Sequence, residues 1–116
     1  MFDFEKLEVY QVIKNHNVKV LEFIISNPPI DEYILNQWKK ASLNILLNLA
    51  ESTGHMNDAE KREFITYARI CVFESVAILD LLKSMGTITD NVFKEIYDGY
   101  EQASKMLLGM YRSYMK

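Results

Sequence analysis

The sequence predicts an all-α protein folded as an up-down-up-down antiparallel four-helix bundle. Its 116 residues, of which 49% are hydrophobic and 25% charged, have the size and composition of one globular domain. Two prolines and four glycines are too few for the many turns of a barrel or sandwich. Apolar residues recur with helical spacing in four segments divided by three short breaks. We therefore expect a single domain over residues 1–116, with helices at about 3–26, 31–52, 58–85 and 89–115 joined by short connections.

Prolines and a capping pair set the first two breaks. The first helix stops at residues 26–29, because the proline pair there lacks backbone N–H groups and restricts the residue before it. The second helix ends near Gly54, which suits a left-handed C-terminal cap. Asn57 followed three residues later by Glu60 is a capping signature and predicts the start of the third helix.

The last break, residues 86–89, divides the third helix from the fourth. Gly86 closes the third helix, and either Thr87 or Thr89 can cap the fourth. Asp90 falls in the first turn, where the helix dipole favours an acid. The fourth helix has a single apolar stripe with a charged side opposite, so it needs only one partner surface.

The other helices carry more apolar surface than a lone bundle can cover. Apolar residues extend over roughly two thirds of the circumference of the second helix, and the first and third helices are also wide-faced. Surplus apolar surface rimmed by polar residues is typical of a contact with another chain, so we expect self-association into a closed ring or a dimer. A monomer with scattered apolar surface residues is the alternative. The interface candidates are Leu43, Leu46, Leu47, Ala50, Ile70, Ala77 and Leu81.

Polar residues fall in two different settings. Asn48 and Glu51 share one side of the second helix with Gln37, Lys40 and Asn44, as the residues of a solvated face do. In helical projection Glu74 is surrounded by Tyr67, Ile70, Ile78, Leu81 and Met85. A carboxylate there needs a partner or a raised pKa, and the candidates are the Asn48 amide, a tyrosine hydroxyl or a basic residue of a neighbouring subunit. We favour a polar link that fixes helix register or subunit geometry, with catalysis as the alternative.

Residues suited to catalysis or metal binding are sparse. The lone Cys71 and the distant His16 and His55 lack zinc-ligand spacing, and no acid precedes a histidine by three residues as it does in di-iron bundles. The sequence has no Gly-rich phosphate loop and no serine nucleophile elbow. We therefore expect no enzymatic activity, no metal and no cofactor.

Charge and hydropathy limit the partners and the location. The net charge of -3 lacks the basic excess of a dedicated nucleic-acid binder. A local basic group could still contact RNA phosphates; its members are Lys39, Lys40, Lys61, Arg62 and Arg69. No segment approaches the roughly 20 uninterrupted apolar residues of a membrane span, and the N-terminus does not read as a secretory signal. We expect a cytoplasmic protein, because a lone cysteine fits a reducing compartment.

Several short motifs resemble those of a known family. Residues 48–55, Asn-Leu-Ala-Glu-Ser-Thr-Gly-His, are similar to the Asn-Ile-Ala-Glu-Gly-Ser-Gly-Arg segment of the four-helix-bundle proteins encoded in intervening sequences of bacterial 23S ribosomal RNA genes. Residues 4–11 resemble the family's Phe-x-x-Leu-x-Val-Tyr opening, and Phe64, Ala68 and Glu74 follow its third-helix pattern. The matching positions are Asn48, Ala50, Glu51, Gly54 and Glu74, whereas Ser52 replaces Gly, His55 replaces Arg, and Ile70 with Cys71 replaces Gly-Ser.

This resemblance implies a ring-like homo-oligomer of four-helix bundles, with a pentamer as the favoured form. The chain is also distantly similar to the pentameric accessory proteins of diversity-generating retroelements, which work with a reverse transcriptase and RNA. We therefore predict a non-enzymatic homo-oligomeric scaffold that offers a surface to a protein or RNA partner. Direct RNA binding through the local basic group is the alternative function.

Overall fold

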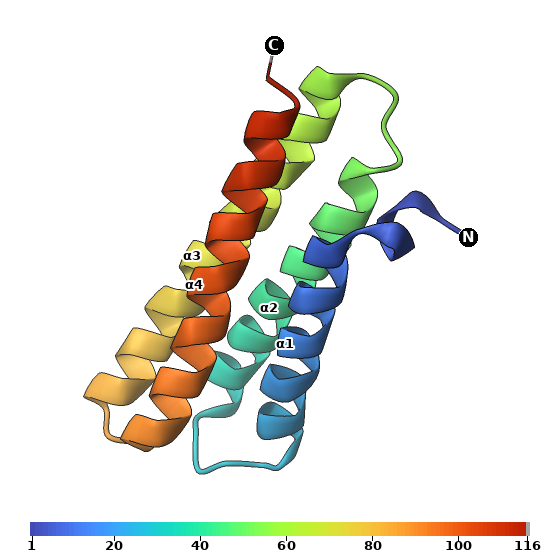
Figure 1. The fold of residues 1–116 in the computed structure, drawn as a ribbon. Coiled ribbons are helices and arrows are strands. Elements are labelled where there is room, and N and C mark those ends of the chain that lie inside the picture. The colour runs from blue at the N-terminus through green and yellow to red at the C-terminus, as the bar shows by residue number, and fades with distance from the viewer. Residues whose placement is uncertain (116) are drawn as a thin grey trace.

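A computed structural model describes residues 1–115 as four long helices without a strand, which confirms the predicted all-α class. Figure 1 shows the helices side by side along the long axis of the molecule. The helices are α1 Glu8–Ile25, α2 Glu32–Ser52, α3 Asp58–Ser84 and α4 Asp90–Ser113, preceded by a short 3-10 helix, η1, at Asp3–Lys6. The molecule measures 45 × 26 × 22 Å.

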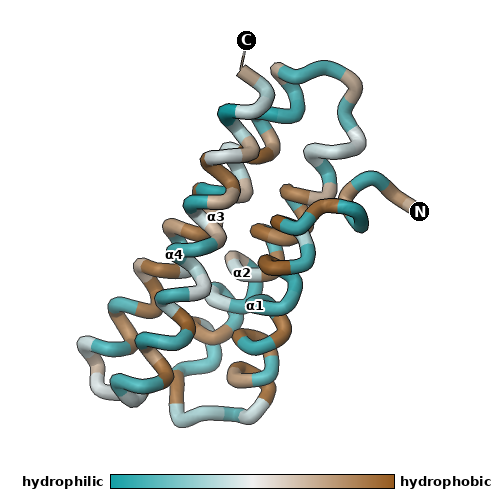
Figure 2. Tube along the Cα trace, viewed as in Figure 1, coloured by the Kyte–Doolittle hydropathy of each residue, from teal (hydrophilic) through white to brown (hydrophobic). Residues whose placement is uncertain are grey.

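Each helix packs against two others, so the four enclose one core. The contacts join α1 to α2, α2 to α3, α3 to α4 and α4 back to α1. In Figure 1 the α1–α2 and α3–α4 connections lie at one end of the molecule, and the α2–α3 connection lies at the other, together with the end of α4. Figure 2 shows hydrophobic positions recurring along every helix between hydrophilic ones, as expected of helices that turn one side to a shared interior.

The chain departs from a single helix over 3–26 at its start. Residues Asp3–Lys6 form η1, and Leu7 is extended, with φ −85° and ψ 130°, before α1 begins. This break lets the Phe4 ring pack against the Tyr10 ring, with centroids 4.7 Å apart. This aromatic contact and a hydrogen bond from the Gln11 side-chain amide to the Glu5 carbonyl oxygen, at 3.2 Å, join η1 to α1.

Side chains cap the starts of three helices. The side-chain oxygens of Asp31, Asn57 and Thr89 accept hydrogen bonds from the backbone N–H groups of Ile34, Glu60 and Val92, at 3.1, 2.8 and 3.2 Å. Each bond satisfies one N–H group that has no partner within the helix. The predicted capping pair of Asn57 and Glu60 is confirmed, and Thr89 rather than Thr87 caps α4.

The C-terminal ends of the helices turn in different ways. Gly86 after α3 is left-handed, with φ 71°, and Asn27 after α1 has φ 58°. The predicted left-handed cap at Gly54 is wrong, because the φ angle of Gly54 is not positive. There the chain continues a right-handed turn, in which the Gly54 N–H donates to the Glu51 carbonyl oxygen at 2.9 Å.

All four helices bury apolar side chains in one continuous core. Its members include Val9, Ile13, Val20 and Ile24 of α1, Leu35, Trp38, Ile45 and Leu49 of α2, Ile65, Val72, Leu79 and Leu82 of α3, and Ile96, Tyr100, Ala103 and Leu107 of α4. Trp38 and Tyr100 are the largest fully buried side chains. Both carry a polar group, which must find a hydrogen-bonding partner inside the core.

Those partners form a central polar layer made of Asn17, Trp38, Ser42, Ser75 and Tyr100. The Trp38 indole N–H donates to the Tyr100 hydroxyl at 2.8 Å, and the Ser42 hydroxyl donates to the Asn17 side-chain oxygen at 2.8 Å. The Tyr100 and Ser42 hydroxyls lie 2.9 Å apart, so Tyr100 donates to Ser42. Ser75 is fully buried beside Tyr100. The hydrogen bonds of this layer join α1, α2 and α4 and so fix the heights of these three helices relative to one another. The Ser75 hydroxyl donates to the Cys71 carbonyl oxygen of its own helix at 2.8 Å.

The absence of a side chain at Gly99 of α4 makes room for the His16 ring of α1. A Cβ atom at this position would lie 2.0 Å from the His16 ring. The ring cannot easily move, because its Nε2 lies 3.0 Å from the Ile96 carbonyl oxygen and its edge meets the Tyr100 ring, with centroids 4.5 Å apart. Gly99 therefore gives His16 the space to pack against the central polar layer.

Replacing Tyr100 with Phe should lower the free energy of unfolding by about 1–3 kcal/mol, because the buried Trp38 N–H and Ser42 hydroxyl lose a shared partner. Urea denaturation followed by circular dichroism measures the change. Tyr97→Phe is the matched control, since Tyr97 lies on the same helix, only partly buried and outside the layer. Equal effects at the two positions would show that the layer contributes no stability of its own.

Two glycines of α4 should respond oppositely to alanine. Gly99→Ala should lower the free energy of unfolding by about 1–3 kcal/mol through overpacking against His16. Gly109 has no atom within 4 Å of the added Cβ, so Gly109→Ala should raise stability, by about 0.5–1 kcal/mol from helix propensity. Thermal unfolding of both variants tests the pair. A stabilising Gly99→Ala would contradict the close α1–α4 contact.

Candidate interaction surfaces

An apolar stripe runs along the outer side of α3. Ile70, Phe73 and Leu81 are 49%, 61% and 49% exposed, and the small exposed Ala77 lies between them in the sequence. Their spacing of three and four residues places them on one side of the helix, opposite the side that faces the core. Ile70, Ala77 and Leu81 were predicted as interface residues, and each is accessible on the surface of a single chain.

A second apolar strip lies on α1 and α2. Leu43 and Leu47 are 39% and 51% exposed, and Val18 of α1 is 48% exposed. The remaining predicted residues of α2 are only half-buried: Leu46 packs against the core, and Ala50 lies beside the first four residues of the chain. The accessible part of this surface is therefore centred on Leu43 and Leu47.

A groove of about 450 Å³ opens between α3 and α4 beside the α3 stripe. It is lined by Thr66, Arg69, Ile70, Phe73, Glu74, Leu108 and Tyr111. The Arg69 Nη2 donates to the Ser104 hydroxyl at 3.2 Å, and its guanidinium lies 5.4 Å from the centre of the Phe73 ring. Its Nε is buried without a hydrogen-bonding partner among residues 1–115. The groove thus continues the apolar stripe toward α4, and its lining includes one cation, Arg69, and one carboxylate, Glu74.

Within residues 1–115 of one chain Glu74 lies on the surface, and none of its expected partners is bonded to it. Glu74 is exposed, and the Asn48 amide donates to the Asn44 carbonyl oxygen at 2.9 Å rather than to Glu74. The projection correctly places Glu74 among apolar residues, but Ile70 and Leu81 are themselves on the outside of the bundle. Of the partners expected for the Glu74 carboxylate, a basic residue of another copy stays a prediction.

The four residues predicted as a polar motif do not converge on one site. Asn48 is half-buried, and Glu51 and Gly54 are exposed where α2 leads into α3. Glu74 lies farther along α3. The pKa of the nearby Cys71 thiol is raised mainly by burial and, to a smaller extent, by the negative charge of Glu74. A high thiol pKa makes Cys71 a poor nucleophile.

The predicted basic group of Lys39, Lys40, Lys61, Arg62 and Arg69 is not one patch, which corrects that expectation. Lys39 and Lys40 are exposed in the first half of α2, whereas Lys61 and Arg62 begin α3 beyond the far end of α2. At a rise of about 1.5 Å per residue, Lys40 lies about 18 Å from that end. Arg62 donates to the Tyr114 carbonyl oxygen, and the Lys61 Nζ lies 5.8 Å from the centre of the Tyr114 ring.

Titratable side chains serve packing and surface contacts in this structure. Within residues 1–115, no cluster of three His, Cys, Asp or Glu side chains is placed to hold a metal ion. The His55 ring stacks on Phe64 and its Nδ1 lies 3.1 Å from a Glu60 carboxylate oxygen. None of the helices described is long and apolar enough to span a membrane.

Comparison with known families accounts for the fold and for the motif positions. The family model described as 23S rRNA-intervening sequence protein matches residues 5–109. The chain belongs to this family. The match runs from η1 through most of α4, so the family resemblance expected from the short motifs is confirmed.

A solved structure shares the fold of this family member. It is a protein of unknown function from the S23 ribosomal protein family of Bacteroides thetaiotaomicron, with a TM-score of 0.84 and 17% sequence identity. The alignment covers 89% of this chain and 97% of that one. At this identity, the likeness shows the shared fold alone. A search of the curated proteins finds no match.

The folded protein should lose stability as the pH falls below 6.5, the ordinary pKa of histidine, because burial lowers the pKa of His16. This effect outweighs the hydrogen bond to the Ile96 carbonyl oxygen, which raises it. On acidification the unfolded chain binds the proton first. The stability contributed by neutral His16 is therefore complete above the unfolded pKa and is lost as the pH falls through the lower folded pKa.

Denaturation midpoints measured between about pH 7.5 and pH 5 test this dependence, because that range spans the ordinary pKa of histidine. His16→Gln should flatten the curve over that range. A variant with the same pH dependence as the wild type would exclude His16 as its source.

Proposed function

We propose that this 23S rRNA-intervening sequence protein is a non-enzymatic scaffold of the bacterial cytoplasm that acts as a homo-oligomer. In this proposal, up-down-up-down antiparallel bundles join side by side into a ring, with a pentamer as the favoured form. The observation that carries it is the pair of accessible apolar strips, one on α3 and one on α1 and α2. Ile70 belongs to the first strip and Leu47 to the second, and each is about half exposed.

The energetics of burial favour covering these strips. Full burial of a large apolar side chain gains about 1.5–3 kcal/mol, so completing the burial of a half-exposed residue gains about 1 kcal/mol. One contact between copies would supply several such gains, from Ile70, Phe73 and Leu81 on α3 and from Val18, Leu43 and Leu47 on the other strip. Two strips on different sides also allow each copy to contact two neighbours, which a ring requires.

The interior supports a structural role rather than catalysis. The polar groups of the core are engaged with one another in the central polar layer, where the Tyr100 hydroxyl bonds both Trp38 and Ser42. Burial raises the pKa of Tyr100, which keeps its hydroxyl neutral as a hydrogen-bond donor. These groups hold the helices in register and leave no free nucleophile or base among them.

RNA binding by the assembled scaffold is the second candidate function. Lys39 and Lys40 are adjacent and exposed on α2. An oligomer would repeat this pair in every copy, so weak single contacts with phosphates would combine into tighter binding. Fluorescence anisotropy with single-stranded RNA at low and moderate salt distinguishes this function from a scaffold for protein alone.

Purified wild-type protein should run in size-exclusion chromatography with light scattering at a multiple of 13.6 kDa, with about 68 kDa for a pentamer. Ile70→Glu should reduce the mass to that of one chain, because a charge in the apolar contact is costly to bury. Gln102→Glu, an exposed change on α4, is the matched control and should keep the wild-type mass. A wild-type mass of 13.6 kDa at micromolar concentration would contradict the scaffold.

A further inference from the structure

We propose that the two apolar strips are partner surfaces for each other, so that the lysine face of one copy packs on the glutamate face of the next. The lysine face consists of Lys14, Val18, Leu43 and Leu47 on α1 and α2. The glutamate face consists of Ile70, Glu74, Ala77 and Leu81 on α3. This pairing rests on the proposed homo-oligomer and adds which surfaces meet and which charges pair.

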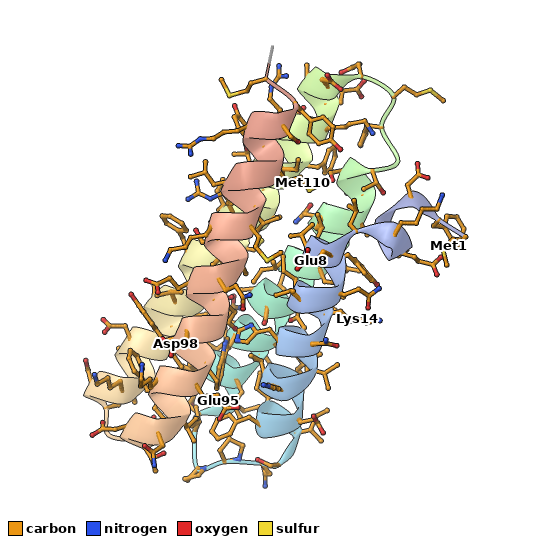
Figure 3. The ribbon with its side chains drawn as sticks, viewed as in Figure 1. Met1, Glu8, Lys14, Glu95, Asp98 and Met110 are labelled. Carbon is orange, nitrogen blue, oxygen red and sulfur yellow. The ribbon has the colours of Figure 1, made fainter. Side chains whose placement is uncertain are left out.

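The lysine face lies on the outer side of α1 and α2, which are neighbours in the bundle. The hydrogen bond between Asn17 and Ser42 marks where these helices touch inside the bundle. Val18 and Leu43 each follow one member of that pair, about 100° farther round the helix, and both are exposed. Lys14 is one turn before Val18 on the same side, and Figure 3 shows it pointing away from α4. Its ammonium group lies 5.7 Å from the centre of the Tyr10 ring.

The glutamate face is acidic because the basic residues of α3 are turned elsewhere. Lys61 contacts the Thr53 carbonyl oxygen, Arg62 that of Tyr114, Arg69 the Ser104 hydroxyl, and Lys83 the face of the Phe93 ring. The outer side of α3 carries the apolar stripe together with Glu74 and, nearer the start of the helix, Glu63. Glu63 already accepts a hydrogen bond from the Tyr67 hydroxyl at 2.7 Å. Glu74 is therefore the carboxylate left for a partner.

The charges of the two faces complement each other. The ion pairs that the structure places within residues 1–115 are Lys19 with Glu95, His55 with Glu60, Lys94 with Asp98 and Lys105 with Glu101. Lys14 and Glu74 belong to none of them. Each stands amid apolar side chains, so bringing the faces together pairs a cation with an anion while burying the surroundings of both. Such a pair selects the partner surface and its register more than it adds affinity.

The two charges also lie within about 3 Å of the same height in the bundle, at a rise of about 1.5 Å per residue. Lys14 precedes Asn17 of the central polar layer by three residues, and Glu74 precedes Ser75 of that layer by one. With a rise of about 1.5 Å per residue, they lie about 4.5 Å and 1.5 Å from the layer. Both displacements point toward the end that holds the α2–α3 connection, because α1 and α3 run in the same direction in Figure 1. Neighbouring copies at equal height can therefore join Lys14 to Glu74.

Pairing unlike faces also avoids the repulsion of the alternative. In a symmetric contact between two glutamate faces, Glu74 of one copy would lie near its counterpart in the other, within the same apolar surroundings. Two carboxylates in such a setting repel each other and resist desolvation. Contact between unlike faces leaves one free face at each end, so further copies add until the assembly closes.

Charge reversal tests the pair. Lys14→Glu and Glu74→Lys should each shift the mass in light scattering from the oligomer toward 13.6 kDa, and the double variant should restore the wild-type mass. Lys105→Glu, a reversal on the exposed side of α4, is the control for net charge and should leave the mass unchanged. Circular dichroism confirms that every variant keeps its helices. A double variant that fails to regain the wild-type mass would overturn the pairing of Lys14 with Glu74.

Mixing two disabled variants tests the pairing of the faces. Ile70→Glu retains only the lysine face, and Leu47→Glu retains only the glutamate face. Each alone should be a monomer, and an equal mixture should form a dimer of about 27 kDa, twice 13.6 kDa. A dimer formed by Leu47→Glu alone, or a mixture that stays monomeric, would overturn the pairing while an oligomeric wild type keeps the proposed scaffold. A monomeric wild type would overturn both.

Discussion

The structure depends on pairing the polar groups that its helices bury in the middle of the core. Trp38 brings an indole N–H and Tyr100 a hydroxyl into the interior, and their bonds to each other and to Ser42 and Asn17 meet that need. Apolar helices alone can slide or rotate past one another at little cost. A chain of directional hydrogen bonds between α1, α2 and α4, with Ser75 of α3 beside it, allows only one register.

Register in the core decides what stays outside. Once Ser75 faces Tyr100, the side of α3 that carries Ile70, Ala77 and Leu81 must point outward. In the same way, the bond between Asn17 and Ser42 turns Val18 and Leu43 to the surface. The accessible apolar strips are thus a consequence of how the interior is satisfied, because these helices carry apolar residues on more than one side. The proposed association of copies would cover them.

Much of the fold follows from local sequence. Helical spacing, the proline pair, the capping pair of Asn57 and Glu60, and Gly86 place four helices with nearly the right ends. The 3-10 turn before α1 escapes such reasoning, because it depends on an aromatic contact between Phe4 and Tyr10 rather than on propensity. Asn17, Ser42 and Ser75 lie on the core stripes of their helices, and that position was the available signal for the central polar layer. The hydrogen-bonding partners of Ser42, however, are 25 or more residues away in the sequence.

The surfaces were less predictable than the helices for a related reason. A projection of α3 correctly groups Glu74 with apolar neighbours, yet it cannot say which of two apolar sides faces the core. The predicted basic group combines residues of two helices, but Lys39 lies at the height of the central polar layer, whereas Lys61 lies near the start of α3, at the end that holds the α2–α3 connection. Native mass spectrometry of the wild type most directly tests whether copies cover the exposed strips. The account predicts a closed assembly at one fixed multiple of 13.6 kDa, and a spectrum of single chains alone would contradict it.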